Sequence, residues 1–191
     1  MITIKILTGS VRPGRFNIQP ATWIYEIAKK RKEIKVELVD LQEVNLPFLD
    51  EPVPPSAKKY TKEHTIRWSK IIEESDGFIF VTPEYNHSYS PVLKNAIDFV
   101  WQEWNYKPVA YISYGSAAGG TRAVEHLRTI AAQTKMYDLN EQIALANYWE
   151  HLDKNGKYQF TKENDQAANA LLDSLIFWAK KMKEARKELN S

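Results

Sequence analysis

Two short segments of this sequence combine residue types that bind anions and flat polar ligands. The first, residues 9–15, is GSVRPGR, and the second, residues 82–91, is TPEYNHSYSP. Each follows an apolar run and precedes a pattern with helical spacing, so each is predicted to join the carboxyl end of a strand to a helix. Open α/β sheets bind their ligands at this edge.

The first segment has the composition of a phosphate-binding loop. Two glycines permit a tight turn, a serine offers a hydroxyl group, and two arginines offer guanidinium groups. These residues are Gly9, Gly14, Ser10, Arg12 and Arg15. A guanidinium group binds two phosphate oxygens at once, and the start of the next helix adds free N–H groups and positive partial charge. The alternative is a solvent-exposed turn without a ligand.

Two rival phosphate motifs are excluded by residue type. The spacing of Gly9 and Gly14 matches a Walker A loop, but Arg15 and Phe16 stand where Lys and Ser or Thr are required. The Rossmann pattern of three glycines, G-x-G-x-x-G, is also absent. We therefore do not expect a P-loop nucleoside triphosphatase or a Rossmann dinucleotide site.

The second segment offers an aromatic face together with hydrogen-bonding groups, in Pro83, Glu84, Tyr85 and Asn86. Pro83 and the helix start at Ser90 and Pro91 constrain its backbone. A third segment, residues 115–120 (GSAAGG), lacks bulk and permits close backbone approach to the other side of a ring. A phosphate joined to a flat heterocycle describes FMN. The alternative for Tyr85 and Asn86 is ordinary turn chemistry.

Other polar residues receive no firm chemical role. His87 is either a proton donor or a polar loop residue, since histidine titrates near neutral pH. Glu84 is expected to accept hydrogen bonds from loop N–H groups. No set of His, Asp and Glu residues has metal-ligand spacing, and Ser10 does not lie in a G-x-S-x-G motif.

Alternation and helical spacing predict the elements that position these loops. Strands are expected at residues 2–8, 34–40, 77–82, 109–114 and 138–145, and helices at about 17–32, 60–74, 91–100, 121–131 and 161–189. Residues 41–55 contain four prolines and are expected to form a loop. Thr161 and Asn164 form only a partial capping box.

Strands that alternate with helices predict an α/β fold: a three-layer, doubly wound domain with a five-stranded parallel sheet. The flavodoxin-like strand order 2-1-3-4-5 places the ligand crevice between the first and third strands. Those are the strands that end in the two segments described above.

Composition sets the protein class. A 43% hydrophobic content in 191 residues fits one domain spanning residues 1–191. The formal charge of +2 suggests no nucleic-acid partner, and the absence of cysteine excludes disulfides and thiol catalysis. No segment approaches the ~20 apolar residues of a membrane helix, and residues 1–7 resemble a strand rather than a signal peptide. A cytoplasmic location is therefore expected.

The three loops, with residues 93–98 and 119–123, resemble the NADPH-dependent FMN reductase family of the flavodoxin-like superfamily over roughly residues 1–145. The resemblance implies that the first loop, to about Ile18, holds the FMN phosphate and that residues 83–86 line the isoalloxazine. Tyr114, Gly115 and Ser116 would close the other side. The expected cofactor-binding residues are Gly9, Ser10, Arg12, Arg15, Asn17, Ile18, Pro83, Glu84, Tyr85, Asn86, Tyr114, Gly115 and Ser116.

The sequence departs from the family pattern in the first and third loops. Family members often carry a second small hydroxyl residue where this chain has Phe16 and Asn17, and Asn17 is a candidate substitute donor. The third loop, with residues 116–118 before its glycines, differs from the commoner glycine-rich form.

The resemblance implies an enzyme that uses FMN and NADPH (or NADH) in alternating half-reactions, with flavins, quinones, azo dyes or metal oxyanions as acceptors. No catalytic side chain is assigned, because the flavin carries the chemistry. Members are usually homodimers or homotetramers, and residues 100–104, rich in Trp, are expected to form a self-association surface. The alternatives are a flavodoxin-type electron carrier, which the charge of +2 disfavours, and a flavin-binding sensor module.

Overall fold

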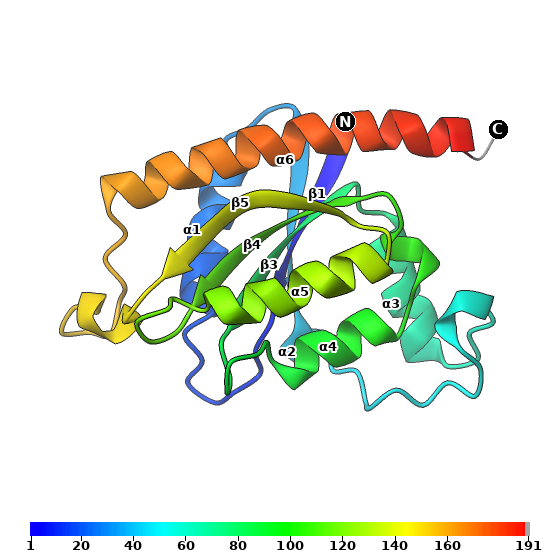
Figure 1. The fold of residues 1–191 in the computed structure, drawn as a ribbon, viewed down its shortest axis with the longest axis horizontal. Coiled ribbons are helices and arrows are strands. Elements are labelled where there is room, and N and C mark those ends of the chain that lie inside the picture. Colours follow the sequence, from blue (N-terminus) through cyan, green and yellow to red (C-terminus); the bar gives the residue numbers. More distant parts are fainter. Residues whose placement is uncertain (190–191) are drawn as a thin grey trace.

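The computed structural model, which describes residues 1–189, contains a five-stranded parallel sheet with the strand order β2-β1-β3-β4-β5 (Figure 1). The strands are β1 (Ile2–Thr8), β2 (Ile34–Asp40), β3 (Gly77–Pro83), β4 (Pro108–Tyr114) and β5 (Tyr137–Leu145). This order confirms the predicted flavodoxin-like topology. The sheet order reverses between β1 and β3, so a crevice opens at their carboxyl ends.

Helices cover both faces of this sheet. They are α1 (Ile18–Ala28), α2 (Leu41–Val44), α3 (Glu63–Glu73), α4 (Pro91–Asp98), α5 (Thr121–Gln133) and α6 (Lys162–Leu189). Figure 1 shows α6, the longest helix, crossing one side of the sheet while α4 and α5 lie on the other. Three short 3-10 turns, at Pro55–Ala57, Gln102–Trp104 and Tyr148–His151, complete the elements of residues 1–189.

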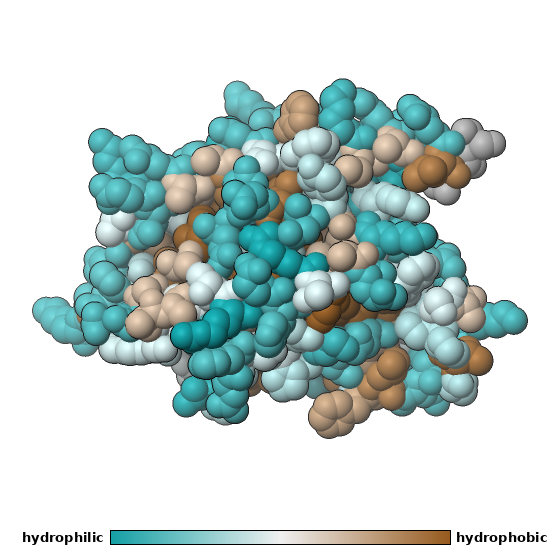
Figure 2. Space-filling view, in the orientation of Figure 1, coloured by the Kyte–Doolittle hydropathy of each residue, from teal (hydrophilic) through white to brown (hydrophobic). Residues whose placement is uncertain are grey.

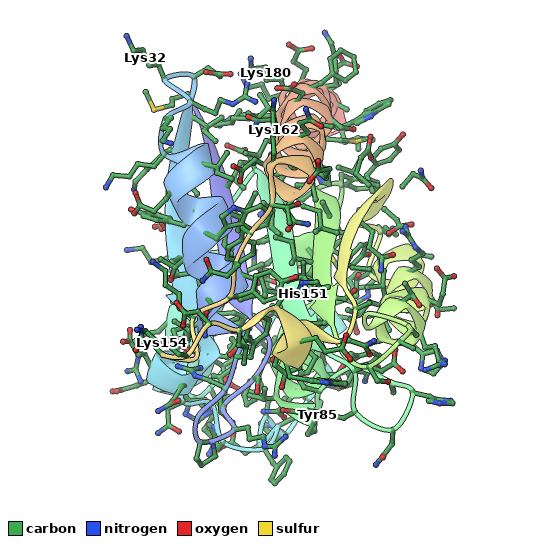
Figure 3. The ribbon with its side chains drawn as sticks, turned by 90° about the vertical axis from the view of Figure 1, so that its left-hand side faces the viewer. Lys32, Tyr85, His151, Lys154, Lys162 and Lys180 are labelled. Atoms are coloured by element: carbon green, nitrogen blue, oxygen red, sulfur yellow. The ribbon has the colours of Figure 1, made fainter. Side chains whose placement is uncertain are left out.

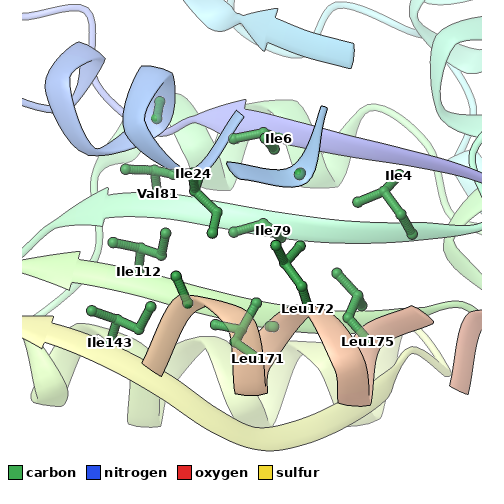
Figure 4. Close-up of a cluster of buried hydrophobic side chains, with 14 of the residues drawn as sticks. Ile4, Ile6, Ile24, Ile79, Val81, Ile112, Ile143, Leu171, Leu172 and Leu175 are labelled. Atoms are coloured by element: carbon green, nitrogen blue, oxygen red, sulfur yellow. The ribbon is translucent and has the colours of Figure 1, made fainter. Parts of the chain in front are cut away.

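One core lies between the sheet and helices α1 and α6 (Figure 4). Alternate residues of each strand point to this face, as the period of a strand requires, and they pack against Leu171, Leu172 and Leu175 of α6. Ile4, Ile79 and Ile112 illustrate the pattern, since each is fully buried. Burial of this kind stabilises the fold by about 2 kcal/mol for each large side chain.

A second core lies on the opposite face, against α3, α4 and α5. Phe78, Phe80 and Tyr111 point there because they alternate in sequence with residues of the first core. Trp104 packs edge-on against the rings of both Phe78 and Phe80. Strands buried on both faces explain why residues 78–81 are apolar throughout.

Residues 41–55 are not the continuous loop that their prolines predict. They begin with the helical turn α2, which forms because the Asp40 side chain accepts a hydrogen bond from the Gln42 amide and so caps it. The turn ends at Asn45, which adopts a left-handed conformation with φ 48°. The loop prediction is therefore correct from Pro47 onward, and the cap at Asp40 is the feature that it misses.

The predicted self-association surface at residues 100–104 is wrong for two of its apolar residues. Val100 and Trp104 are buried in the second core. The Trp104 indole N–H donates to the carbonyl groups of Ile97 and Val100, so its polar edge is satisfied inside the protein. Trp101, which lies between them in the sequence, remains partly exposed.

Helix boundaries differ from prediction by a few residues. α3 begins at Glu63 rather than near Tyr60, and α4 ends at Asp98 rather than at Val100. The capping box before α6 is complete, because Thr161 and Asn164 exchange hydrogen bonds between their side chains and backbone amides. Asn164 therefore takes the place of the Glu or Gln that is usual in this motif.

Asp76, at the start of β3, ties the end of α6 to the amino edge of the sheet. Its carboxylate accepts hydrogen bonds from Lys183 at 2.8 Å, from Arg186 at 2.7 Å and from the Thr3 amide at 3.0 Å. Lys183 also donates to the carbonyl of Met1. The first strand and the last turns of α6 therefore lie together, as Figure 1 shows.

The outer surface in Figure 2 is mostly hydrophilic, with hydrophobic side chains in small separate patches on the face that is visible. Within residues 1–189, no helix has the length and apolar content needed to cross a membrane.

Candidate active site

A cavity of about 380 Å³ lies at the carboxyl edge of the sheet, at the crevice between β1 and β3. It is lined by the loops after β1, β3 and β4 and by a segment after β5. The lining residues are Ser10, Arg12, Pro13, Gly14, Arg15, Phe16, Pro83, Glu84, Tyr85, Tyr114, Gly115, Ser116, Tyr148 and Trp149. This volume lies in the range of small-molecule sites, about 300–1,000 Å³.

The loop after β1 is held close to β3 by its first glycine. The Gly9 amide donates to the Val81 carbonyl at 2.7 Å, and a Cβ atom at Gly9 would lie only 2.8 Å from the same oxygen. Gly14 adopts a left-handed conformation with φ 68°. Within residues 1–189, the amides of Val11, Gly14 and Phe16 donate no hydrogen bond to the protein, so they remain available to an anion.

The two arginines of this loop differ in their contacts. Arg15 forms a bidentate pair with Asp40, with N–O distances of 2.7 and 2.5 Å, and also donates to the Ser10 carbonyl. Both side chains are largely buried, at 12% and 15% exposure. Arg12 is exposed at the cavity and makes no side-chain hydrogen bond or ion pair within the described chain. Arg15 therefore fixes the loop, and Arg12 is the guanidinium group that is free for a ligand.

The pair with Arg15 also affects the acidity of Asp40. Burial by itself would raise the pKa of this carboxyl group, but hydrogen bonds from Arg15, Gln42 and Thr8 outweigh it and lower the pKa below its ordinary value. Asp40 is therefore charged at neutral pH and holds Arg15 firmly.

Three hydroxyl groups meet on the floor of the cavity. Ser10 Oγ lies 3.0 Å from Tyr85 Oη, and the Tyr114 side chain lines the cavity with them. Burial, reinforced by the neighbouring Tyr85, raises the pKa of Tyr114 above its ordinary value. The Tyr114 hydroxyl is therefore neutral at physiological pH, and all three hydroxyl groups can donate or accept hydrogen bonds.

The loop after β3 contains a two-residue hairpin. Tyr85 and Ser88 exchange backbone hydrogen bonds of 2.7 and 3.0 Å, while Asn86 and His87 between them have φ 49° and 67°. Two consecutive left-handed residues are typical of a type I′ turn. Ser88 is fixed in turn by its contact with His126 Nδ1 at 2.9 Å. The hairpin therefore holds Tyr85 in place beside the cavity.

The helix after this hairpin starts as predicted, with Ser90 as its cap and Pro91 at its first position. The Ser90 hydroxyl accepts a hydrogen bond from the Leu93 amide and donates one to the Gly9 carbonyl. The start of α4 is therefore bonded directly to the loop after β1.

The loop after β4 is tied to the same region through Glu84. This carboxylate is 8% exposed and accepts hydrogen bonds from the guanidinium group of Arg122 at 2.6 Å and from its amide at 3.2 Å. Glu84 therefore acts as an acceptor at the start of α5, whereas the sequence predicted that it would accept from loop N–H groups. Gly120 has φ 84°, and a Cβ atom there would lie 2.8 Å from Ser113 and Tyr114.

Phe16, Tyr148 and Trp149 form an aromatic wall that sequence reasoning missed. Phe16 and Tyr148 stack with ring centroids 4.2 Å apart and an interplanar angle of 24°. Phe16 and Tyr148 each also meet the Tyr114 ring edge-on. Phe16 is 6% exposed, whereas Trp149 is 49% exposed. The segment that carries Tyr148 and Trp149 lies at the same end of the sheet as Tyr85 (Figure 3).

The structure brings most of the predicted site residues together. Nine of them line the cavity: Ser10, Arg12, Arg15, Pro83, Glu84, Tyr85, Tyr114, Gly115 and Ser116. Gly9, Asn17, Ile18 and Asn86 are not among the lining residues. Asn17 is fully buried behind the loop, where its amide nitrogen donates to the Ser10 carbonyl at 3.4 Å and its side-chain oxygen has no partner in the described chain.

This arrangement can hold an anion at one end and a flat ring at the other. The anion end has a hydroxyl group, together with amides and a guanidinium group that have no partner within residues 1–189. The ring end has a constrained hairpin and a small-residue loop. A doubly wound α/β fold with such a cavity at its switch point defines a flavodoxin-like, cofactor-binding class of protein. The family model for NADPH-dependent FMN reductases matches residues 2–150, and the chain belongs to this family.

Two relatives agree with this assignment, and a solved structure shares the fold. An NAD(P)H-dependent FMN reductase of Schizosaccharomyces pombe is 44% identical over 139 residues, covering 71% of this chain and 69% of that protein. An NAD(P)H:quinone oxidoreductase of Solanum tuberosum is 31% identical over 196 residues, covering 96% and 95%. The solved structure of FerB, an NAD(P)H:(acceptor) oxidoreductase from Paracoccus denitrificans, has a TM-score of 0.76 at 23% identity, covering 95% and 99%.

Proposed function

We propose that this chain is an FMN-dependent NAD(P)H oxidoreductase, which transfers a hydride through the flavin to small acceptors such as flavins, quinones and azo compounds. The observation that carries the proposal is that the loops after β1, β3 and β4 converge on one cavity. In this proposal residues 1–191 act as one FMN-binding reductase domain. Membership of the FMN reductase family supports the choice of cofactor.

The loop after β1 fits the phosphate group of FMN. Ser10 offers its hydroxyl, Arg12 offers a guanidinium group without a partner in the described chain, and the amides of Val11, Gly14 and Phe16 are free. The start of α1 adds positive partial charge. Gly9 and Asn17 support this site from behind, and Arg15 keeps the loop in shape through Asp40. Ile18, the first residue of α1, lies outside the lining of this cavity.

The loops after β3 and β4 fit the isoalloxazine ring. Pro83, Glu84 and Tyr85 line one side, with Asn86 at the tip of the hairpin that positions them. Gly115 and Ser116 line the other side, where the absence of bulky side chains lets the backbone approach the ring. The Ser10–Tyr85 contact sets the spacing between the phosphate end and the ring end.

FMN, when bound, supplies the transfer of two electrons between NAD(P)H and the acceptor. The residues of this chain bind it, orient it and exclude water from one side. We assign no catalytic side chain, and His87, exposed at the hairpin tip, receives no role in the reaction.

A quinone is a proposed acceptor because the Solanum tuberosum relative, which matches almost the whole chain, is an NAD(P)H:quinone oxidoreductase. The balanced formal charge of +2 supports small-molecule acceptors over a nucleic-acid partner. We also propose a cytoplasmic enzyme without a membrane partner.

We further propose a homodimer or homotetramer that associates through the region beside α4. The Asn95 side chain donates to the Pro47 carbonyl at 2.7 Å and accepts from the Leu49 amide at 3.1 Å, so residues 47–49 are fastened to α4. This places Phe48, 85% exposed, and Leu49, 42% exposed, next to that helix. Exposed apolar side chains of this kind favour association between protein surfaces.

The test is a visible absorption spectrum of the purified protein with FMN, before and after addition of NADPH without oxygen. Flavin that stays with the protein through gel filtration and loses its absorbance with NADPH, then regains it with a quinone, supports the proposal. Bound flavin that NADPH leaves unchanged would favour an electron carrier or a sensor module. A protein that does not bind FMN would overturn the assignment.

A further inference from the structure

Trp149 lies at the rim of the cavity, and its side chain is 49% exposed. It comes from the 3-10 turn Tyr148–His151, which follows β5 and was not expected to contribute to the site. Its ring partner within the described chain is Tyr148, which it meets edge-on at 5.4 Å and 73°. About half of its surface is open to solvent.

Two attachments hold this turn over the cavity. On one side Tyr148 stacks on Phe16, which belongs to the loop after β1. On the other side the Asn147 amide donates to the Ser116 carbonyl at 3.2 Å, in the loop after β4. The turn therefore joins the loop proposed to hold the phosphate to one of the loops proposed to hold the ring.

The backbone of the turn is also constrained. Asn147 has φ 41°, a left-handed conformation that asparagine tolerates better than most residues, and its carbonyl accepts from the Glu150 amide at 2.8 Å. Because these contacts are made within the protein, the backbone that carries Trp149 is ordered before a ligand arrives. A preordered aromatic surface of this kind favours binding of a flat ligand.

We propose that Trp149 contacts FMN directly and forms the outer wall of its site, where it slows release of the cofactor. This inference rests on the proposed function, because it takes FMN as the ligand of the cavity. It adds a binding residue from beyond β5 to a site that sequence motifs place only after β1, β3 and β4.

The experiment compares FMN binding by the wild-type protein with Trp149→Ala, Trp149→Phe and a matched control, Phe177→Ala. Phe177 is also half-exposed, at 54%, and also meets its sequence neighbour edge-on, at 5.3 Å and 84°, but it lies on α6 away from the cavity. The measured quantities are the dissociation constant, the release rate and the fluorescence of the bound flavin, which contact with an indole quenches by electron transfer.

Trp149→Ala is expected to weaken FMN binding about tenfold, mainly through faster release, and to make the bound flavin brighter. For Trp149→Phe, the three measured quantities should lie between those of the wild type and of Trp149→Ala. This variant also keeps the test valid if the alanine variant folds poorly. Phe177→Ala should match the wild type in all three quantities.

Wild-type values for both Trp149 variants, in a protein that binds FMN, would overturn this inference and leave the proposed function intact. A difference that emerges only when a quinone is added would also overturn it, because Trp149 would then contact the acceptor rather than FMN. Failure of the wild type itself to bind FMN would reject the proposed function and this inference together.

Discussion

The hydroxyl groups of Ser10 and Tyr85 lie 3.0 Å apart, although 75 residues separate them in the sequence. This contact joins the loop after β1 to the hairpin after β3 across the crevice. The Ser90–Gly9 hydrogen bond joins the same two loops a second time. The two ends of the proposed FMN site are therefore parts of one hydrogen-bonded unit, and a change in one loop is expected to affect the other.

Arg12→Ala is expected to weaken FMN binding by about tenfold to a hundredfold, because a charge-assisted hydrogen bond is worth about 1.5–3 kcal/mol. The midpoint of thermal unfolding should stay unchanged, since Arg12 is exposed and its side chain makes no hydrogen bond or ion pair within the described chain. A titration of the variant with FMN, followed by flavin absorbance, measures the effect. An unchanged dissociation constant would show that Arg12 does not hold the phosphate.

Arg15→Ala is expected to lower the free energy of unfolding by about 2 kcal/mol, because it leaves the largely buried Asp40 carboxylate without its bidentate partner. Urea unfolding of the FMN-free protein measures this loss, and Arg12→Ala serves as the control in the same loop. Equal stability of the two variants would contradict the division of roles between these arginines.

Asp40 is expected to contribute to the acid sensitivity of the fold. The pKa of Asp40 in the folded protein lies below its ordinary value of 3.8. The ionised carboxylate therefore contributes its full stabilisation of the fold above pH 3.8, and this contribution is lost as the pH falls through the pKa of the folded protein. Asp40→Asn should therefore flatten the acid limb of the stability curve. Urea unfolding at a series of acidic pH values tests this, and a variant with the wild-type slope would refute it.

Gly9→Ala is expected to destabilise the protein by about 1–3 kcal/mol, because its Cβ atom would lie 2.8 Å from the Val81 carbonyl oxygen. Gly14→Ala is the comparison, since a Cβ atom at Gly14 would have no neighbour within 4 Å and only the φ of 68° opposes the change. That variant should lose about 1 kcal/mol. Thermal unfolding of both tests whether close approach, rather than turn conformation, dominates at Gly9.

Phe48→Ser is expected to shift the proposed oligomer towards monomer without unfolding it. Phe48 is 85% exposed, so its replacement removes little packing within one chain. Light scattering at several protein concentrations measures the change, and Phe177→Ser on α6 provides the exposed aromatic control. A wild-type protein that is monomeric throughout would contradict the proposed association.

The sheet and most helices could be predicted because local patterns determine them. Ile4 and Ile6 alternate with residues of the opposite face, and Ser90 and Pro91 mark the start of α4 by their side-chain chemistry. The parallel sheet followed from the alternation of strands and helices, and the strand order was that of the flavodoxin-like fold, which five such strands suit. The same reasoning located nine lining residues, because ligand loops in this fold lie at predictable strand ends.

The remaining features depend on contacts between distant residues. Tyr148 and Phe16 stack across more than a hundred residues, and no local spacing signals that contact. Arg15 was expected to offer its charge to a phosphate, but Asp40, at the end of the neighbouring strand, forms a bidentate pair with it. Trp104 was expected near a surface, yet its indole finds two carbonyl groups in the core.

The attachment of α6 to Asp76 has a practical consequence for orientation. Lys183 and Arg186 hold the last turns of α6 beside Met1 and Thr3, at the amino edge of the sheet, whereas the cavity opens at the carboxyl edge. A tag or linker joined near residue 1 or beyond α6 would therefore anchor the molecule on the side away from the cavity. Immobilised on an electrode by such a linker, the protein would present its cavity to the solution.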